Sequence, residues 1–142
     1  MSQPPLECPC QAGLKAPVTY ADCCGRWHGP PAAPGQTAAA VHAAPDAQAL
    51  MRSRYSAYAL GRLDYLLATW HASTRPPALE PLEPGLRWIS LELRRHEHTA
   101  PDEAVVEFVA RSKLGGRAHR LHETSRFVRE AGRWWYVDGQ VR

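Results

Sequence analysis

The sequence has no long hydrophobic run and no stretch with the pattern of a leader segment. None of its apolar stretches approaches the ~18 residues that a membrane-spanning helix needs. The opening stretch MSQPPLECPC has neither the basic region nor the apolar region of a secretory signal. We therefore expect a cytoplasmic protein with no membrane partner, in a compartment where stable disulfide bonds are rare.

A strong excess of charge of one sign is also absent. The chain has 17 Lys and Arg residues against 14 Asp and Glu residues, and the net charge of +3 lies entirely after residue 45. Proteins that bind the phosphate backbone show a much denser basic surface. The charge balance thus permits a nucleic-acid partner without indicating one.

Cysteine is absent from every position after residue 24. All four cysteines lie in CPCQAGLKAPVTYADCC, with the spacing C-x-C-x12-C-C. Two close pairs of thiolates separated by a loop are a common way for a short chain to supply the tetrahedral ligands of zinc. The metal ligands predicted by this pattern are Cys8, Cys10, Cys23 and Cys24.

Other interpretations of the cysteines are weaker. A disulfide between the adjacent Cys23 and Cys24 would be strained, and the C-x-x-C of a redox dithiol does not occur. Free thiols without a shared role remain an alternative. His28 could substitute for one cysteine as the fourth ligand. Because four protein ligands leave no position for water, the predicted Zn²⁺ is structural.

Three regions differ in composition. Residues 1–28 hold the cysteines and are interrupted by proline and glycine, which predicts a small zinc knuckle. Residues 29–45 are almost wholly Pro, Ala and Gly, as is typical of a linker. Residues 46–142 have the apolar patterning of an α+β domain.

In this third region two helices precede four strands. Asp46 is a predicted N-cap of a helix over 47–60, and Gly61 a predicted stop. Asp64 is predicted to cap a second helix over 65–73. The predicted strands are 86–95, 103–112, 118–130 and 133–139. The first of them places Ile89, Leu91 and Leu93 on one face. Two or three helices would then pack on one face of an antiparallel sheet.

The third strand suggests a cavity under this sheet. Side-chain alternation places Glu123 and Ser125 on the same face as Leu121 and Phe127, turned toward the helices. A carboxylate in that position needs a partner. The candidate cavity residues are Arg52, Arg54, Tyr55, Tyr58, His71, Glu123 and Ser125. They could bind a small ligand or form a buried structural ion pair, and the sequence favours the ion pair.

Two resemblances rest on specific blocks. The order C-P-C, glycine and lysine, then YADCCGR resembles the SEC-C motif, a zinc-binding module found in the SecA translocation ATPase and in many bacterial proteins. The loop of twelve residues between its second and third ligands is longer than usual. Together with that motif, LMRSRYSAY, TWH, VEFVAR, LHETSRF and GRWWYVDG are similar to the YchJ family.

The family resemblance implies a SEC-C module followed by a domain similar to nuclear transport factor 2, a cone of helices wrapped by a curved antiparallel sheet. It assigns no reaction, and no catalytic residue is predicted. The SEC-C resemblance implies a protein or ribosome-associated partner. We therefore expect a non-enzymatic adaptor that docks through its knuckle, and as an alternative an enzyme or small-molecule binder that uses the inner cavity. Related domains also suggest a homodimer through the sheet.

Overall fold

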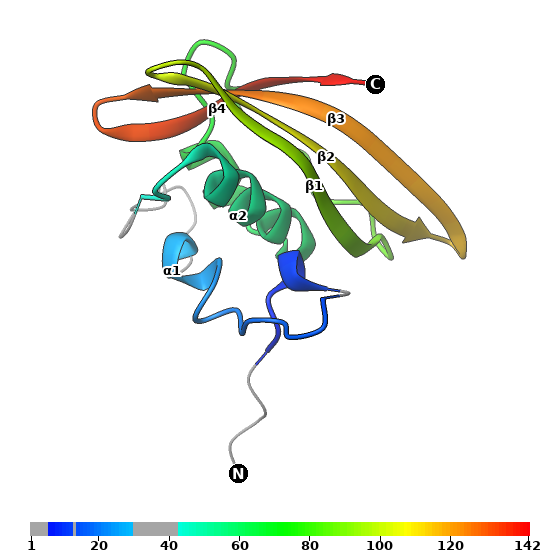
Figure 1. The fold of residues 1–142 in the computed structure, drawn as a ribbon. Coiled ribbons are helices and arrows are strands. Elements are labelled where there is room, and N and C mark those ends of the chain that lie inside the picture. Colours follow the sequence, from blue (N-terminus) through cyan, green and yellow to red (C-terminus); the bar gives the residue numbers. More distant parts are fainter. Residues whose placement is uncertain (1–5, 13, 30–42) are drawn as a thin grey trace.

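The computed structural model describes residues 6–12, 14–29 and 43–142. Two short helical turns, η1 (Pro9–Gln11) and α1 (Gly25–His28), lie in the N-terminal segment. The helices α2 (Ala47–Leu60) and α3 (Leu63–Ala68) follow. The strands β1 (Arg87–Ala100), β2 (Glu103–Leu114), β3 (Arg117–Glu130) and β4 (Arg133–Val141) complete the chain. Figure 1 shows a curved sheet with α2 under its concave side and the N-terminal segment below α2.

Helix α2 begins and ends where the sequence predicts. The Asp46 side chain accepts a hydrogen bond of 2.7 Å from the Ala49 backbone N–H, as an N-cap does. Gly61 ends the helix in the left-handed conformation at φ 73°, which glycine adopts without steric cost. Both predictions are confirmed.

Helix α3 differs from its prediction. It starts at Leu63, so Asp64 lies inside its first turn and forms an ion pair of 3.0 Å with Arg62 instead of capping the helix. The helix ends at Ala68, and Trp70 then forms a β-bridge with Tyr136. The prediction of a helix over 65–73 was wrong at its end, because the chain after Ala68 pairs with β4 and does not continue the helix.

The four strands form one antiparallel meander in the order β1-β2-β3-β4, as predicted. The prediction for β1 was wrong in one detail. The register shifts between Trp88 and Ser90, so the strand has a β-bulge at Ile89. Leu91 is 8% exposed whereas Ile89 is 41% exposed on the outer side. A bulge reverses side-chain alternation, and alternation alone does not reveal it.

The N-terminal segment packs on the rest of the protein. Cys8, Cys10 and Cys24 belong to the same buried cluster as Leu50 of α2 and Phe127 of β3. This packing between segments distant in sequence gives the knuckle a fixed position under α2.

Most of the predicted linker over 29–45 lies outside the described residues, and the three-part division of the chain stays a prediction. No helix within the described ranges combines the length and hydropathy needed to cross a bilayer.

Candidate functional site

The four cysteines are brought together by a short pairing of two chain segments. The Cys8 backbone N–H donates to Val18 O at 3.0 Å, and the Tyr20 N–H donates to Leu6 O at 2.7 Å. The turn η1 follows Cys8 and contains Cys10. Cys23 and Cys24 directly precede α1. All four sulfur atoms therefore lie close together, between η1 and α1.

Gly25 is required by the close approach of this loop to Tyr20. Its N–H donates to Tyr20 O at 2.8 Å, and a Cβ at this position would lie 2.6 Å from the same oxygen. We expect Gly25→Ala to destabilise the metal-bound knuckle by about 1–3 kcal/mol, because the backbone that carries Cys23 and Cys24 must move. Competition with a chromophoric chelator measures the effect. The exposed neighbour Asp22→Ala is the control, and equal metal affinity in both variants would contradict this account.

The sulfur positions fit a tetrahedral metal ion. All four Sγ atoms lie within 4.8 Å of one another. Cys10 Sγ lies 3.7 Å from Cys8 Sγ, 3.5 Å from Cys23 Sγ and 3.6 Å from Cys24 Sγ. A tetrahedron with metal–sulfur distances of ~2.3 Å has sulfur–sulfur edges of ~3.8 Å. The donor set is therefore spaced as a single metal ion requires.

The surroundings of the sulfurs favour a bound cation. Burial, together with the neighbouring Cys10 sulfur, raises the pKa of the Cys23 thiol above its usual value when no cation lies between the sulfurs. A divalent ion removes this penalty because it compensates the thiolate charges. The hydroxyl of Ser56 on α2 also donates to Cys24 Sγ at 3.2 Å. Gln11 Nε2 donates to Cys10 Sγ at 3.5 Å, so two side chains that the sequence did not single out support the ligands.

His28 is not part of the four-cysteine group. Its Nε2 is 2.7 Å from the Ser53 backbone oxygen, and its Nδ1 is 2.6 Å from the Tyr20 hydroxyl. Burial lowers the pKa of this imidazole below its usual value. The Nε2 contact joins the knuckle to α2, the Nδ1 contact lies within the knuckle, and both ring nitrogens have partners other than the sulfurs.

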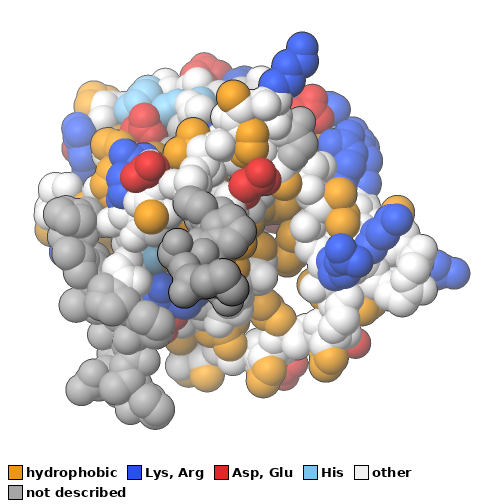
Figure 2. Space-filling view, turned by 90° about the horizontal axis from the view of Figure 1, so that it is seen from below, with side chains coloured by type: hydrophobic (Ala, Val, Ile, Leu, Met, Phe, Trp, Pro, Cys, Tyr) orange, Lys and Arg blue, Asp and Glu red, His pale blue; other side chains and the backbone are white. Residues whose placement is uncertain are grey.

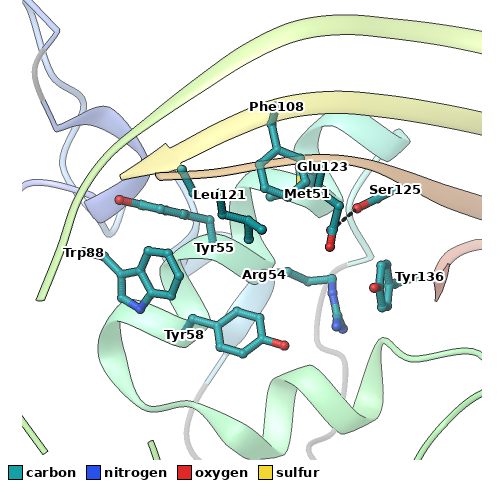
Figure 3. A pocket seen from close by; sticks show the side chains of 11 residues that line it. Met51, Arg54, Tyr55, Tyr58, Trp88, Phe108, Leu121, Glu123, Ser125 and Tyr136 are labelled. Carbon is teal, nitrogen blue, oxygen red and sulfur yellow. Dashed lines mark hydrogen bonds between the residues drawn. The ribbon is translucent and has the colours of Figure 1, made fainter. Parts of the chain in front are cut away.

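A second candidate site is a cavity of about 290 Å³ between α2 and the concave face of the sheet. Figure 3 shows its walls, and Figure 2 shows hydrophobic side chains around a hollow on this side of the molecule. Most of its lining is apolar, with one guanidinium and one carboxylate. The lining residues are Met51, Arg54, Tyr55, Tyr58, Trp88, Phe108, Ala110, Leu121, Glu123, Ser125 and Tyr136.

Five of the seven candidate cavity residues line this space, and two do not. Arg52 points to the knuckle and donates to the Cys10 carbonyl at 3.3 Å. His71 lies outside, 2.6 Å from Glu130 Oε2 and 2.7 Å from Ser73 Oγ. The helical spacing of Met51, Arg54, Tyr55 and Tyr58 defines one face and would have excluded Arg52. The predictions for Arg52 and His71 were wrong in placement, and the sequence analysis also missed Met51, Trp88, Phe108, Ala110 and Tyr136.

Arg54 is fixed at one end of the cavity. Its Nη1 donates to Leu66 O at 2.8 Å and to Thr69 Oγ1 at 2.7 Å. The guanidinium lies over the Tyr136 ring at 4.2 Å and over the Trp70 ring at 5.0 Å. Desolvation lowers the pKa of this guanidinium, which is only 4% exposed. The predicted structural ion pair is not formed: among the described residues no carboxylate lies within ion-pair distance of Arg54.

Glu123 lies on β3, and its Oε2 accepts a hydrogen bond of 2.8 Å from Ser125 Oγ. Gly139 on β4 leaves room for this carboxylate, because a Cβ there would lie 2.5 Å from Glu123 Oε2. As Figure 3 shows, the carboxylate and the Arg54 side chain approach the cavity from opposite sides. The cavity therefore carries one group of each charge, held by separate partners.

Known proteins resemble this chain in sequence and in fold. Residues 46–139 match the family model described as the middle domain of YchJ, similar to nuclear transport factor 2. The chain belongs to the YchJ family. A UPF0225 protein of Methylibium petroleiphilum is 61% identical over 137 residues, which cover 96% of this chain and 90% of that protein. A UPF0225 protein of Bordetella parapertussis is 50% identical over 138 residues, with 97% and 95% coverage.

Two solved structures extend the similarity to the N-terminal segment of this YchJ family member. A SEC-C motif protein from Rhodopseudomonas palustris superposes with a TM-score of 0.71 at 28% identity, over 90% of this chain and 95% of that one. A SEC-C motif protein from Psychrobacter arcticus gives a TM-score of 0.73 at 28% identity, over 96% and 82%. The predicted fold class and family are thereby confirmed.

Proposed function

We propose that this protein is a zinc-dependent adaptor whose knuckle docks onto a protein or ribosome-associated partner. The observation that carries the zinc assignment is the all-sulfur donor set, since four thiolates at tetrahedral spacing select zinc over harder cations. A cytoplasmic location fits it, because a reducing compartment keeps free thiols available for metal binding.

The exposed surface of the knuckle supports docking. Leu6, Leu14 and Val18 are 59%, 51% and 41% exposed, and they account for three of the six exposed large apolar side chains among the described residues. Buried metal ligands beneath exposed apolar side chains suit a rigid contact surface rather than a reactive centre. The SEC-C motif named for both solved neighbours is consistent with this role.

A double substitution tests the docking proposal. We expect Leu14→Asp with Val18→Asp to reduce partner binding by about tenfold or more, because charges would replace apolar contacts at the interface. Covalent cross-linking in lysate followed by mass spectrometry measures the yield of partners joined to residues 6–29. Ile89→Asp is the matched control, since Ile89 has the same 41% exposure as Val18 but lies on the sheet. Equal yields from wild type, double variant and control, with full metal content in each, would contradict the proposal.

The second proposed function is a small-molecule binder that uses the cavity. Its support is the combination of apolar walls with a buried guanidinium and a carboxylate. Ligand sites commonly have this composition, in which a few fixed polar groups orient a ligand held by apolar contacts.

A further inference from the structure

The cavity under the sheet is suited to one small ligand. Its volume of about 290 Å³ is just below the roughly 300–1,000 Å³ range of ligand sites, which suits a ligand of few atoms. Phe108 and Leu121 lie across the cavity from Tyr58, and the Trp88 ring lies beside Tyr58, with ring centroids 6.3 Å apart (Figure 3). Aromatic and branched walls of this kind accept an aromatic or branched apolar group.

Arg54 offers hydrogen-bond donors at one end of this space. Its Nη1 is occupied by Leu66 O and Thr69 Oγ1, whereas no hydrogen bond joins its Nε or Nη2 to another described residue. The rings of Trp70 and Tyr136 lie against the guanidinium and hold it in place, so it loses little conformational freedom on binding. A carboxylate is the group that its planar donors bind best.

Glu123 offers an acceptor nearby. Its carboxylate is half-buried, is held by Ser125, and forms no ion pair with the other described residues. A ligand's ammonium group would therefore give Glu123 the positively charged partner that the other described residues do not supply. Because burial of an uncompensated charge is costly, a ligand that carries only one charge would leave either Arg54 or Glu123 without a partner.

We propose that the cavity binds a small zwitterion of the α-amino-acid class with an aromatic or branched apolar side chain. This inference rests on the second proposed function and names its ligand. The ligand's carboxylate accepts from Arg54, its ammonium group donates to Glu123, and its side chain packs against Trp88, Phe108 and Leu121. The net charge of the ligand is zero, as is the summed charge of the two groups that bind it.

Titration with three probes of similar shape tests this assignment. L-Phenylalanine has both charges, 3-phenylpropionate lacks the amine, and phenethylamine lacks the carboxylate. Amide shifts in ¹H–¹⁵N spectra of the full zinc-loaded chain report binding to α2 and β3. We expect phenylalanine to bind about tenfold or more tightly than either analogue, which is the effect of one charge-assisted hydrogen-bonded pair.

Two variants locate the ammonium site. Glu123→Gln has nearly the same shape, and we expect it to abolish the preference for phenylalanine over 3-phenylpropionate. Gly139→Ala displaces the carboxylate without removing its charge, and the same preference should fall. In both variants, unchanged amide shifts in β1 and α3 show that the fold is intact.

The outcomes separate this inference from the function on which it rests. If 3-phenylpropionate binds as tightly as phenylalanine, or if Glu123→Gln keeps the preference, the zwitterion class is wrong while the cavity remains a binding site. If no probe shifts amides of α2 or β3 at millimolar concentration, both the ligand class and the second proposed function are overturned.

Discussion

Cys24→Ser should abolish the proposed zinc binding and separate residues 6–29 from α2. The Cys24 side chain is 1% exposed, and its sulfur lies at the centre of the contacts among Cys10, Cys23 and Ser56. A hydroxyl is a poor zinc ligand at neutral pH, so the remaining three thiolates would hold the ion far less tightly. The loss in affinity should exceed the roughly 10–100-fold that removal of an outer-shell partner causes.

Hydrogen exchange measures the structural consequence. The amides of Cys8, Tyr20 and Trp27 donate hydrogen bonds inside the knuckle, and their protection should disappear in Cys24→Ser. Amides of the β2–β3 ladder should keep theirs, because this pairing runs along the whole of β2 and includes no cysteine. Strong chelation of the wild type should reproduce both results.

Ser56→Ala is the graded control for this prediction. It removes a hydroxyl that donates to Cys24 Sγ from α2 but leaves all four ligands in place. We expect metal affinity to fall by about 10–100-fold, with the knuckle still folded when metal is in excess. Protection of the knuckle amides that survives chelation in the wild type would show that the metal ion is not what holds this segment.

Arg54→Ala should destabilise the domain by about 2–4 kcal/mol. Its guanidinium joins α2 to Leu66 O in α3, and it packs against the rings of Trp70 and Tyr136. Truncation leaves the Leu66 carbonyl without this donor, removes two cation–π contacts and enlarges the cavity beside β4. Urea unfolding followed by tryptophan fluorescence measures the change in the free energy of unfolding.

Arg126→Ala provides a matched arginine. Arg126 forms two hydrogen bonds of 2.6 Å with Asp138, but its side chain is 63% exposed. Solvent screening limits such pairs, so we expect a loss of no more than about 1 kcal/mol. If Arg126→Ala cost as much as Arg54→Ala, burial and stacking would not be the source of the Arg54 contribution.

Local signals in the sequence predicted much of this structure. Asp46 and Gly61 gave the bounds of α2 because capping depends on one or two residues. The alternation of Leu121, Glu123, Ser125 and Phe127 placed Glu123 and Ser125 in the cavity lining. The blocks that resemble the YchJ family supplied the long-range arrangement that these local patterns do not contain.

Three features depended on tertiary packing and were not predicted. The bulge at Ile89 arises from the pairing of β1 with β2, and pattern alone does not indicate it. The contact of Ser56 with Cys8 and Cys24 joins positions more than thirty residues apart. Pairing of His71 with Glu130 depends on where the chain meets β4 after α3. Predicting each of these features requires knowing which elements lie next to one another in the fold, and local sequence patterns do not contain this information.

X-ray absorption at the zinc edge, on purified reduced protein with its metal content quantified, tests the central claim most directly. The account predicts one zinc ion per chain surrounded by four sulfur atoms at ~2.3 Å. A nitrogen or oxygen neighbour in the first coordination shell, or protein that is folded over residues 6–29 without a stoichiometric metal ion, would contradict it.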